Sequence, residues 1–379
     1  CATVGPNQNV FYGTGNSFNM NGALFSELQD GSLGAGVTRL TVKSSADAAA
    51  LEALFMPDSH WRDLLAYTWT LAPHQGAANI AAALVRQGVQ VTIFNQRSVE
   101  EVFSMLYQVA AMVGPGAAGT AYIPALADFV PMVKNIGSMA LGGPALVKAM
   151  TGEDISEQDL GGSKMHCTKS GVGDVEVADD AACIALIKDY LSYFPSSCED
   201  KPPRLPVTDP VDRRDEHLLD LLPENPRKAY DMYKLIGSIV DHGKWLDIKP
   251  RWARSIITCL ARVGGRPVGI VANQPNHLGG ILDVDSADKA ARFMEICDAF
   301  NIPLVFLQDV PGFMIGSKVE HEGIIRHGAK MLHVMAAATV PKITVVVRKA
   351  YGAGYYVMCG RAYEPDLIVG WPTGEISVM

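Results

Sequence analysis

Small residues at the end of an apolar strand are the first feature of this sequence that could do chemistry. The run ITVVVRK (343–349) is typical of a buried strand, and AYGAGYYV (350–357) follows it directly. A strand that ends in a small-residue turn and then enters a helix exposes several backbone N–H groups at one point. Such a turn predicts a site for a negatively charged oxygen.

A similar arrangement occurs earlier in the chain. QVAAMVGPGAAGTAYIPA (108–125) and KITVVVRKAYGAGYYVMC (342–359) each place an apolar strand before a Gly/Ala-rich turn that carries a tyrosine. Ala118 and Ala353 stand 235 residues apart, which is about one domain length. A duplicated domain is one interpretation; the other is that any two buried strands followed by small-residue turns look alike.

Three kinds of anion site compete for these turns. GPGAAG (114–119) fits the dinucleotide pattern GxGxxG, but Pro115 removes one N–H group and Pro124 interrupts the helix that should follow. The sequence contains no GxxxxGK[ST] phosphate loop. The third interpretation is an oxyanion hole, in which paired backbone N–H groups meet the oxygen of an enolate. That hole needs small residues, so that a flat thioester can lie against the backbone.

Composition narrows the class of protein. The 379 residues are 48% hydrophobic and 19% charged, as in a globular protein long enough for two domains. A net charge of −8 argues against a large nucleic-acid surface. Seven scattered cysteines without a CxxC pair suggest a reducing compartment. The apolar stretch 109–133 contains three prolines and Asp128, so buried core is favoured there over a membrane span.

The second half of the chain alternates strand and helix patterns. We expect strands at 266–273, 303–313 and 343–349 and helices at 286–300, 321–339 and 354–363. This alternation predicts parallel strands joined by helical crossovers. The proline-rich and charged segment 196–217 reads as a linker between two domains.

Long motifs carry a family resemblance. FLQDVPGFMIGSKVEHEGIIRHGAKMLHVMAAATVPKITVVVRKAYGAGYYVMCGRAYEPDLIVGWPTGEISVM and GPGAAGTAYIPALADFVPMVK resemble the carboxyltransferase (beta) subunit of biotin-dependent acyl-CoA carboxylases, from about residue 100 to the end. The resemblance implies an α/β fold of two crotonase-like (ββα-superhelix) domains related by duplication. We expect an N-terminal carboxyltransferase domain at 1–201, with 1–45 unassigned, and a C-terminal one at 202–379. Only about a dozen residues join VTIFNQ (91–96) to the next strand, so the N-terminal domain looks incomplete beside the family.

The resemblance also implies which negatively charged oxygens the two turns hold. In the family, two adjacent backbone amides of the N-terminal turn hold the thioester oxygen of acyl-CoA, and here these are Ala118 and Gly119. Two amides of the C-terminal turn hold the ureido oxygen of biotin, and here these are Ala353 and Gly354. Carboxybiotin, carried on a partner subunit or domain, releases CO₂ when its ureido oxygen takes up charge, and the biotin anion then removes the acyl α-proton. No metal bound by this chain is expected.

The residues leave the substrate open. Propionyl-CoA carboxylases of the family have an aspartate where this chain has Tyr356, and YVMCGRAY (356–363) resembles methylcrotonyl-CoA carboxylases. DVPGF (309–313) and GIIRHGAK (323–330) point to the propionyl-CoA branch. Tyr356 is therefore a candidate substrate-binding residue, and propionyl-CoA or a related short or branched acyl-CoA is the expected substrate.

The family implies further expectations about partners. These are a biotin carboxylase, a biotin carboxyl carrier, and a homodimer or a hexamer built from such dimers, without nucleic acid or membrane. The expected location is the cytoplasm or the mitochondrial matrix. Two alternatives stay open at this point: a biotin-dependent acyl-CoA decarboxylase or transcarboxylase subunit, and a non-catalytic assembly subunit.

Other polar clusters favour structural interpretations. His166 and Cys167 are adjacent and so are poorly placed for a nucleophile and its base. His321, His327 and His333 recur every six residues, which does not put them on one helix face. The acidic run EDISEQD (153–159) has no histidine at ligand spacing, and a solvated surface with a helix cap is the simpler interpretation.

Overall fold

The computed structural model describes residues 2–4, 38–40, 108–195, 200–210 and 212–378. The chain divides into two compact units, Cys1–Gln108 and Val109–Met379. In the first unit, the antiparallel strands β1 (Ala2–Val4) and β2 (Thr38–Leu40) are described. The second unit carries both small-residue turns.

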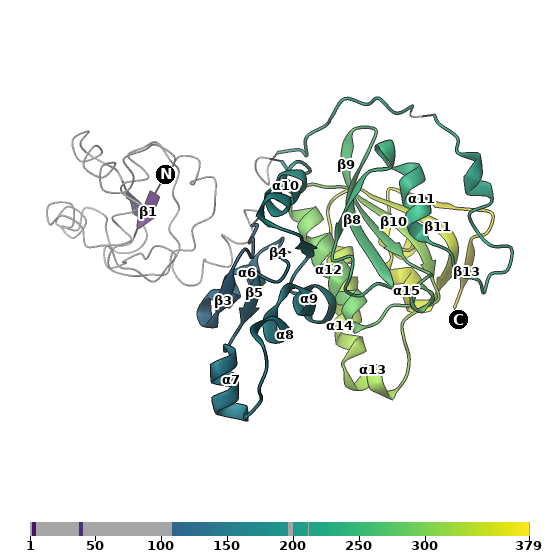
Figure 1. Ribbon diagram of the computed structural model, residues 1–379. Helices are drawn as coiled ribbons and strands as arrows, with labels where there is room; N and C mark the ends of the chain where they lie inside the picture. The colour runs from purple at the N-terminus through teal and green to yellow at the C-terminus, as the bar shows by residue number, and fades with distance from the viewer. Residues whose placement is uncertain (1, 5–37, 41–107, 196–199, 211, 379) are drawn as a thin grey trace. The chain divides into compact units, whose positions relative to one another are not determined.

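A seven-stranded mixed sheet organises the C-terminal part of this unit (Figure 1). Its order is β12-β11-β10-β9-β8-β7, with β13 also paired to β11. Strands β7, β8 and β9 are antiparallel, while β9, β10, β11 and β12 run parallel through crossovers. The strands are β7 (Trp245–Ile248), β8 (Ile256–Val263), β9 (Arg266–Asn273), β10 (Leu304–Val310), β11 (Lys342–Tyr351), β12 (Leu367–Gly370) and β13 (Glu375–Ser377).

Helices form the crossovers and cover the sheet. Asp283 begins α12 with a capping box, since its carboxylate accepts from Ser286 N–H while the Ser286 hydroxyl accepts from Asp283 N–H. The crossover from β10 to β11 is interrupted by Gly323, whose φ of +87° is left-handed. The helices of this part are α11 (Met232–Ile239), α12 (Val284–Ala299), α13 (Ser317–His321), α14 (Ile324–Ala337), α15 (Gly352–Val357) and the 3-10 turns η3 (Glu216–Leu219), η4 (Asp241–Gly243), η5 (Leu278–Gly280) and η6 (Arg361–Tyr363).

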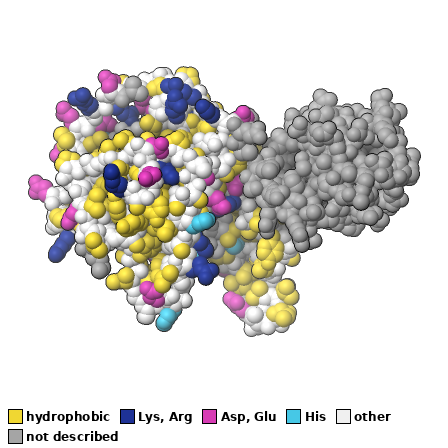
Figure 2. Space-filling view, turned by 180° about the vertical axis from the view of Figure 1, so that it is seen from behind, with side chains coloured by type: hydrophobic (Ala, Val, Ile, Leu, Met, Phe, Trp, Pro, Cys, Tyr) yellow, Lys and Arg dark blue, Asp and Glu magenta, His cyan; other side chains and the backbone are white. Residues whose placement is uncertain are grey.

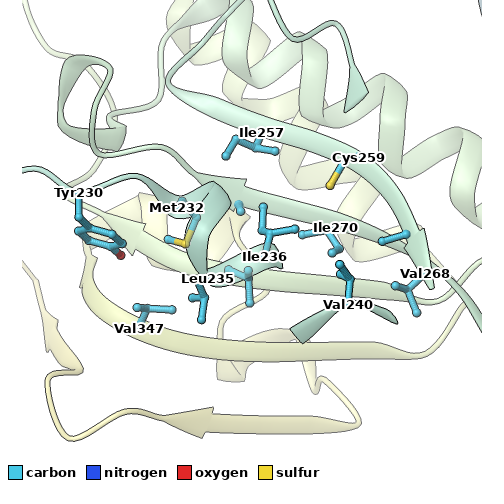
Figure 3. Close-up of a cluster of buried hydrophobic side chains, with 13 residues drawn as sticks. Tyr230, Met232, Leu235, Ile236, Val240, Ile257, Cys259, Val268, Ile270 and Val347 are labelled. Carbon is cyan, nitrogen blue, oxygen red and sulfur yellow. The ribbon is translucent and has the colours of Figure 1, made fainter. Parts of the chain in front are cut away.

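A buried cluster lies between α11 and the sheet (Figure 3). Leu235 and Ile236 of α11 pack with Ile257, Ile270 and Val347 of three different strands, and each of these side chains is almost fully buried. Burying side chains of this size stabilises a fold by about 2 kcal/mol each. The cluster therefore holds β8, β9 and β11 against α11. The position of the C-terminal end of β11, where the second turn begins, follows from this packing.

Residues 109–195 form short parallel pairs rather than one extended sheet. β3 pairs with β5, and β4 pairs with β6. A smaller core of Val130, Met132, Met139 and Cys167 lies among them. The elements are β3 (Pro115–Ala117), η1 (Ala118–Ala121), α6 (Tyr122–Leu126), β4 (Pro131–Val133), β5 (Ser138–Ala140), α7 (Pro144–Thr151), α8 (Glu157–Gly161), α9 (Ser163–Met165), the π-helix η2 (His166–Ser170), β6 (Val175–Val177) and α10 (Asp180–Leu191).

The two parts of this unit are joined by a loop that precedes β8. Lys249 Nζ lies 2.8 Å from an Asp174 carboxylate oxygen and donates to the Gly171 carbonyl at 2.6 Å. Both ionised side chains are largely buried, and such a pair is far less screened than a surface pair. The Trp252 ring covers Gly171 so closely that a Cβ there would lie 2.5 Å from ring carbons.

Aromatic side chains form a second link between the parts. Tyr190 of α10 stacks on Phe129 with ring centroids 4.1 Å apart, and it also contacts Phe194. Phe194 in turn meets the edge of Phe300, just beyond α12, at 5.5 Å. Arg292 of α12 adds an ion pair to Asp128 at 2.8 Å. The expected linker 196–217 runs without helix or strand from residue 200 to Asp215 where it is described.

Most elements expected in the second half are confirmed, with differences at two helices. The helix expected at 321–339 is α14, which begins only at Ile324, because Gly323 after α13 takes the left-handed conformation. The helix expected at 354–363 is α15 followed by the 3-10 turn η6. In the first half, the apolar stretch 109–114, which is the strand expected to follow 91–96, forms only isolated bridges, Val109 to Phe129 and Met112 to Met132, and the strand before the turn is β3. The expected strand 91–96 lies outside the described residues. Among those residues, no helix has the length and apolar character that a membrane crossing needs.

The contact between Gly171 and Trp252 gives a stability prediction. We expect Gly171→Ala to lower the free energy of unfolding by about 3 kcal/mol, because φ is +69° and the new Cβ would overlap the indole ring. Gly152→Ala is the matched control, since φ there is +77° but no atom lies within 4 Å of a Cβ; about 1 kcal/mol is expected. Urea denaturation measures both, and equal losses would contradict the proposed contact.

Candidate active site

The C-terminal turn lies where β11 passes into α15. Gly352, with φ of +53°, begins the helix, and a Cβ there would lie 2.9 Å from the Val378 carbonyl oxygen. Ala353 is exposed, Gly354 is buried, and no side chain caps α15 at its N-cap residue Tyr351. The first N–H groups of a helix have no acceptor within the helix. Ala353 and Gly354 thus lie in the first turn of α15, and their role as a pair of donors to an anion stays a prediction.

Packing within the chain requires a glycine at position 354. A Cβ at this position would lie 2.7 Å from Val310 Cγ2 and 3.1 Å from Gly312 Cα. The helix therefore rests directly on the backbone that follows β10. Only glycine permits this approach, which places the start of α15 against the Pro311–Gly312 turn.

A break in the sheet register lies beneath this contact. Gln308 of β10 pairs with Val346 of β11, but Val310 pairs with Ala350, so the ladder is interrupted at Asp309. The Asp309 carboxylate accepts the Lys349 N–H at 3.2 Å, which satisfies a donor that the interrupted ladder leaves open. Its other oxygen is 2.9 Å from Arg348 Nε.

The Asp309–Arg348 pair is almost completely buried and fully connected. Arg348 also donates to the Lys228 carbonyl at 2.9 Å and lies 4.9 Å from the Tyr230 ring centroid. Asp309 N–H donates to the side-chain oxygen of Asn273. Burial raises the pKa of the Asp309 carboxyl, against the opposing effect of the Arg348 guanidinium. The network holds the ends of β10 and β11 in one geometry.

The N-terminal turn is more open. Ala118 begins η1 directly after β3, and its φ of +55° is left-handed although it carries a Cβ. Gly119 is exposed, and a Cβ there would meet nothing within 4 Å. Ala118 and Gly119 thus lie at the start of η1, and their role as a pair of donors to an anion stays a prediction.

The two turns do not form one cavity within a chain. Figure 1 shows β3 and α6 well apart from α15 within the same unit. Tyr356 lies on α15 and is 49% exposed, with its ring 6.0 Å from that of Tyr355 and 6.5 Å from that of Tyr363. It therefore lies on the same short helix as Ala353 and Gly354 and belongs to the C-terminal turn.

The other polar clusters have structural roles. His166 Nε2 bonds the Met139 carbonyl and Nδ1 bonds the Ser170 hydroxyl, both at 2.7 Å, and burial lowers the pKa of the ring. Burial raises the pKa of Cys167 to about 12, which opposes a thiolate. His327 pairs with Asp288 at 2.7 Å. Ser156 caps α8, as expected for 153–159. Within the described ranges, no group of three His, Cys, Asp or Glu side chains suits a metal ion.

The sequence did not single out the residues that support the C-terminal turn. Gly312 lies against Gly354, and Asp309 pairs with Arg348 at the ends of β10 and β11, but the sequence offered only the DVPG motif as a signal. An aspartate before Pro-Gly at a strand end resembles an ordinary turn. The pairing of Asp309 with Arg348 depends on the parallel register of β10 and β11, which no local pattern specifies.

The chemistry available here is stabilisation of negative charge by the backbone. Two adjacent amides at the start of each turn can donate to one oxygen, and the small residues leave room for a planar group to approach. Each such donor contributes about 3 kcal/mol to a transition state that develops an oxyanion.

Comparisons with known proteins agree with this geometry. The family model of the carboxyl transferase domain matches residues 62–379. The chain is 42% identical over 313 residues to the mitochondrial propionyl-CoA carboxylase beta chain of Homo sapiens, covering 81% of this chain and 58% of that protein. It is equally identical over 313 residues to the methylmalonyl-CoA decarboxylase subunit alpha of Propionigenium modestum, covering 81% of this chain and 60% of the other.

Solved structures show the same fold. A crystal structure of transcarboxylase 12S with hydrolysed methylmalonyl-coenzyme A superposes with a TM-score of 0.71 at 44% identity, covering 73% of this chain and 54% of that one. The expected crotonase-like α/β class is confirmed by this likeness. The chain thus spans little more than half the length of these relatives. From the match over residues 62–379 and the shared fold, the chain belongs to the carboxyl transferase domain family.

Proposed function

We propose that this protein is a carboxyltransferase subunit of a biotin-dependent acyl-CoA carboxylase, which moves a carboxyl group from carboxybiotin to the α or vinylogous carbon of an acyl-CoA. The observation that carries the proposal is a pair of adjacent backbone amides at the start of a helical turn at each of two places, Ala118 with Gly119 and Ala353 with Gly354. The domain boundary between 201 and 202 belongs to the same proposal.

The residues at the C-terminal turn suit the ureido oxygen of biotin. The uncapped start of α15 offers two N–H groups without an acceptor in the helix, and an anionic oxygen is favoured there. When bound, carboxybiotin supplies the carboxyl group and, after CO₂ is released, the base for the acyl α-proton. Ala353 and Gly354 stabilise the charge on the ureido oxygen, and Ala118 and Gly119 hold the thioester oxygen on which the enolate charge develops.

The proposed substrate is propionyl-CoA or a related short or branched acyl-CoA. Two relatives are named for propionyl-CoA carboxylation and methylmalonyl-CoA decarboxylation, which interconvert the same pair of acyl groups in opposite directions. Tyr356 is the candidate for substrate discrimination, since its exposed ring stands on the same helix as the amides.

A decarboxylase or transcarboxylase subunit is the second candidate. Relatives named methylmalonyl-CoA decarboxylase and transcarboxylase 12S support it, because two oxyanion holes serve both directions of transfer equally. Purification from the source cell separates the candidates. Association with a biotin carboxylase favours the carboxylase, and association with membrane subunits favours a decarboxylase. A non-catalytic assembly role would require that the protein does not bind acyl-CoA.

A second copy of the chain completes the proposed site. Carboxyl transfer needs the two bound groups face to face, whereas the two turns of one chain lie apart (Figure 1). Figure 2 shows apolar side chains gathered on the projecting lobe that carries α7, where Leu146 and Met150 are 55% and 77% exposed. Such a surface suits a protein partner. Both transcarboxylase 12S structures are described as hexamer assemblies, which supports a dimer-based oligomer here.

The function is tested by reverse transfer. We expect the intact protein to move the carboxyl group of methylmalonyl-CoA to free biotin, with propionyl-CoA as the other product. Chromatography of the CoA esters follows the reaction, with omission of biotin as the control. Absence of transfer from both methylmalonyl-CoA and malonyl-CoA, by a folded oligomer that binds acyl-CoA, would contradict the proposal.

Gly354→Val tests the C-terminal turn. The new side chain would press on Val310 and Gly312 and displace the amide pair, so transfer to biotin should fall at least about 100-fold. Acyl-CoA affinity, measured by calorimetry, should stay within about twofold because the N-terminal turn is untouched. A phosphate-binding role of this turn predicts the reverse pattern, namely weakened CoA binding with an unchanged maximal rate.

Ala118 allows the complementary test at the N-terminal turn. Ala118→Gly should keep full transfer activity, because glycine accepts the left-handed conformation that alanine holds at a cost of about 1 kcal/mol. Ala118→Val should lower the rate at least about tenfold and weaken acyl-CoA binding, since a β-branched residue resists this φ. Wild-type kinetics of the valine variant in a folded protein would remove Ala118 from the site.

A further inference from the structure

Two buried polar side chains on one face of the sheet lie under the end of α15. Gln308 of β10 and Thr344 of β11 are both 0% exposed. The register pairs Phe306 with Thr344 and Gln308 with Val346, so these side chains share a face that is otherwise apolar here. A buried polar group destabilises a core by about 1–3 kcal/mol unless it is hydrogen-bonded, so each needs a specific partner.

Both partners are carbonyls at the C-terminal end of α15. Gln308 Nε2 donates to the Met358 carbonyl at 2.5 Å, and Thr344 Oγ1 donates to the Cys359 carbonyl at 2.8 Å. The last carbonyls of a helix lack N–H donors within it. Cys359 is left-handed, with φ of +58°. The sheet thus supplies side-chain donors to two consecutive carbonyls where the helix ends.

The position of these bonds bears on the amide pair. α15 has six residues and is about 9 Å long, so its two ends move together as one short rigid body. Its first turn rests on Val310 and Gly312, but those contacts are van der Waals contacts, which set distance more than orientation. The two hydrogen bonds at the far end are directional and fix the rotation of the helix about its axis.

We propose that Gln308 and Thr344 are positioning residues for carboxyl transfer, which aim the Ala353 and Gly354 amides at the ureido oxygen by holding the far end of α15. This inference rests on the proposed function of the C-terminal turn. Neither side chain touches the substrates. Their loss misaligns the donors, and misplacement of a catalytic group by about 1 Å lowers a rate by as much as about 100-fold.

Thr344 offers a matched pair of variants. Thr344→Val removes the hydroxyl at nearly constant volume, and Thr344→Ser keeps it. We expect Thr344→Val to lower the maximal transfer rate to biotin about tenfold while acyl-CoA affinity stays within about twofold, and Thr344→Ser to restore the rate to within about threefold of wild type. Gln308→Met should resemble Thr344→Val, and hydrogen exchange of residues 352–360 should quicken in both.

Thr258→Val is the control for a purely structural loss. Thr258 of β8 is 1% exposed and donates to the Ile248 carbonyl at 2.8 Å, which is the same kind of bond in the same sheet away from α15. It should lower the melting temperature as much as Thr344→Val but leave transfer unchanged. Equal transfer rates in the Thr258 and Thr344 variants would overturn the inference. Absence of transfer in the wild type would instead overturn the proposed function, and unchanged hydrogen exchange at 352–360 would still reject the positioning role.

Discussion

The buried ion pair between Asp309 and Arg348 is the interaction on which the C-terminal turn depends. It lies where the ladder between β10 and β11 is interrupted, and the Asp309 carboxylate takes over the Lys349 N–H that the ladder leaves unpaired. A buried carboxylate is tolerated only when its lone pairs are satisfied, and here the Arg348 guanidinium and the Lys349 N–H donate to them. The pair therefore holds the irregular end of β11 in one conformation. This matters for the C-terminal turn because α15 begins only two residues beyond Ala350.

Small residues serve two purposes at the proposed site. At Gly354 the absence of a side chain lets α15 touch the Pro311–Gly312 backbone, which is a requirement of packing. At Gly119 a Cβ would meet nothing of the chain, so that glycine is not required by the described residues around it. The backbone supplies the donors at both turns, and backbone groups held in a rigid fold need little reorganisation when charge develops. Backbone donors at the two turns can therefore support the proposed chemistry.

The joint between residues 109–195 and the C-terminal part orients the two turns within one chain. Lys249 reaches across to Asp174 and Gly171, while Tyr190 joins Phe129 to the aromatic cluster. Close packing of Gly171 on Trp252 leaves little freedom at this joint. A fixed joint that keeps the turns apart is consistent with a site assembled from two chains.

The sequence alone determined the strands at 266–273 and 343–349 and the presence of two small-residue turns, because periodicity and turn residues are local signals. The class of fold followed from the resemblance of long motifs to a known family. The sequence could not determine the interruption at Gly323, the loss of the strand expected at 109–114, or the support of α15 by Gln308, Asp309 and Thr344. The support of α15 depends on the register of the parallel strands β10 and β11, whose paired residues are about 40 residues apart in the chain. Only the tertiary structure decides which carbonyl each buried donor meets, because that choice is made by neighbours in space.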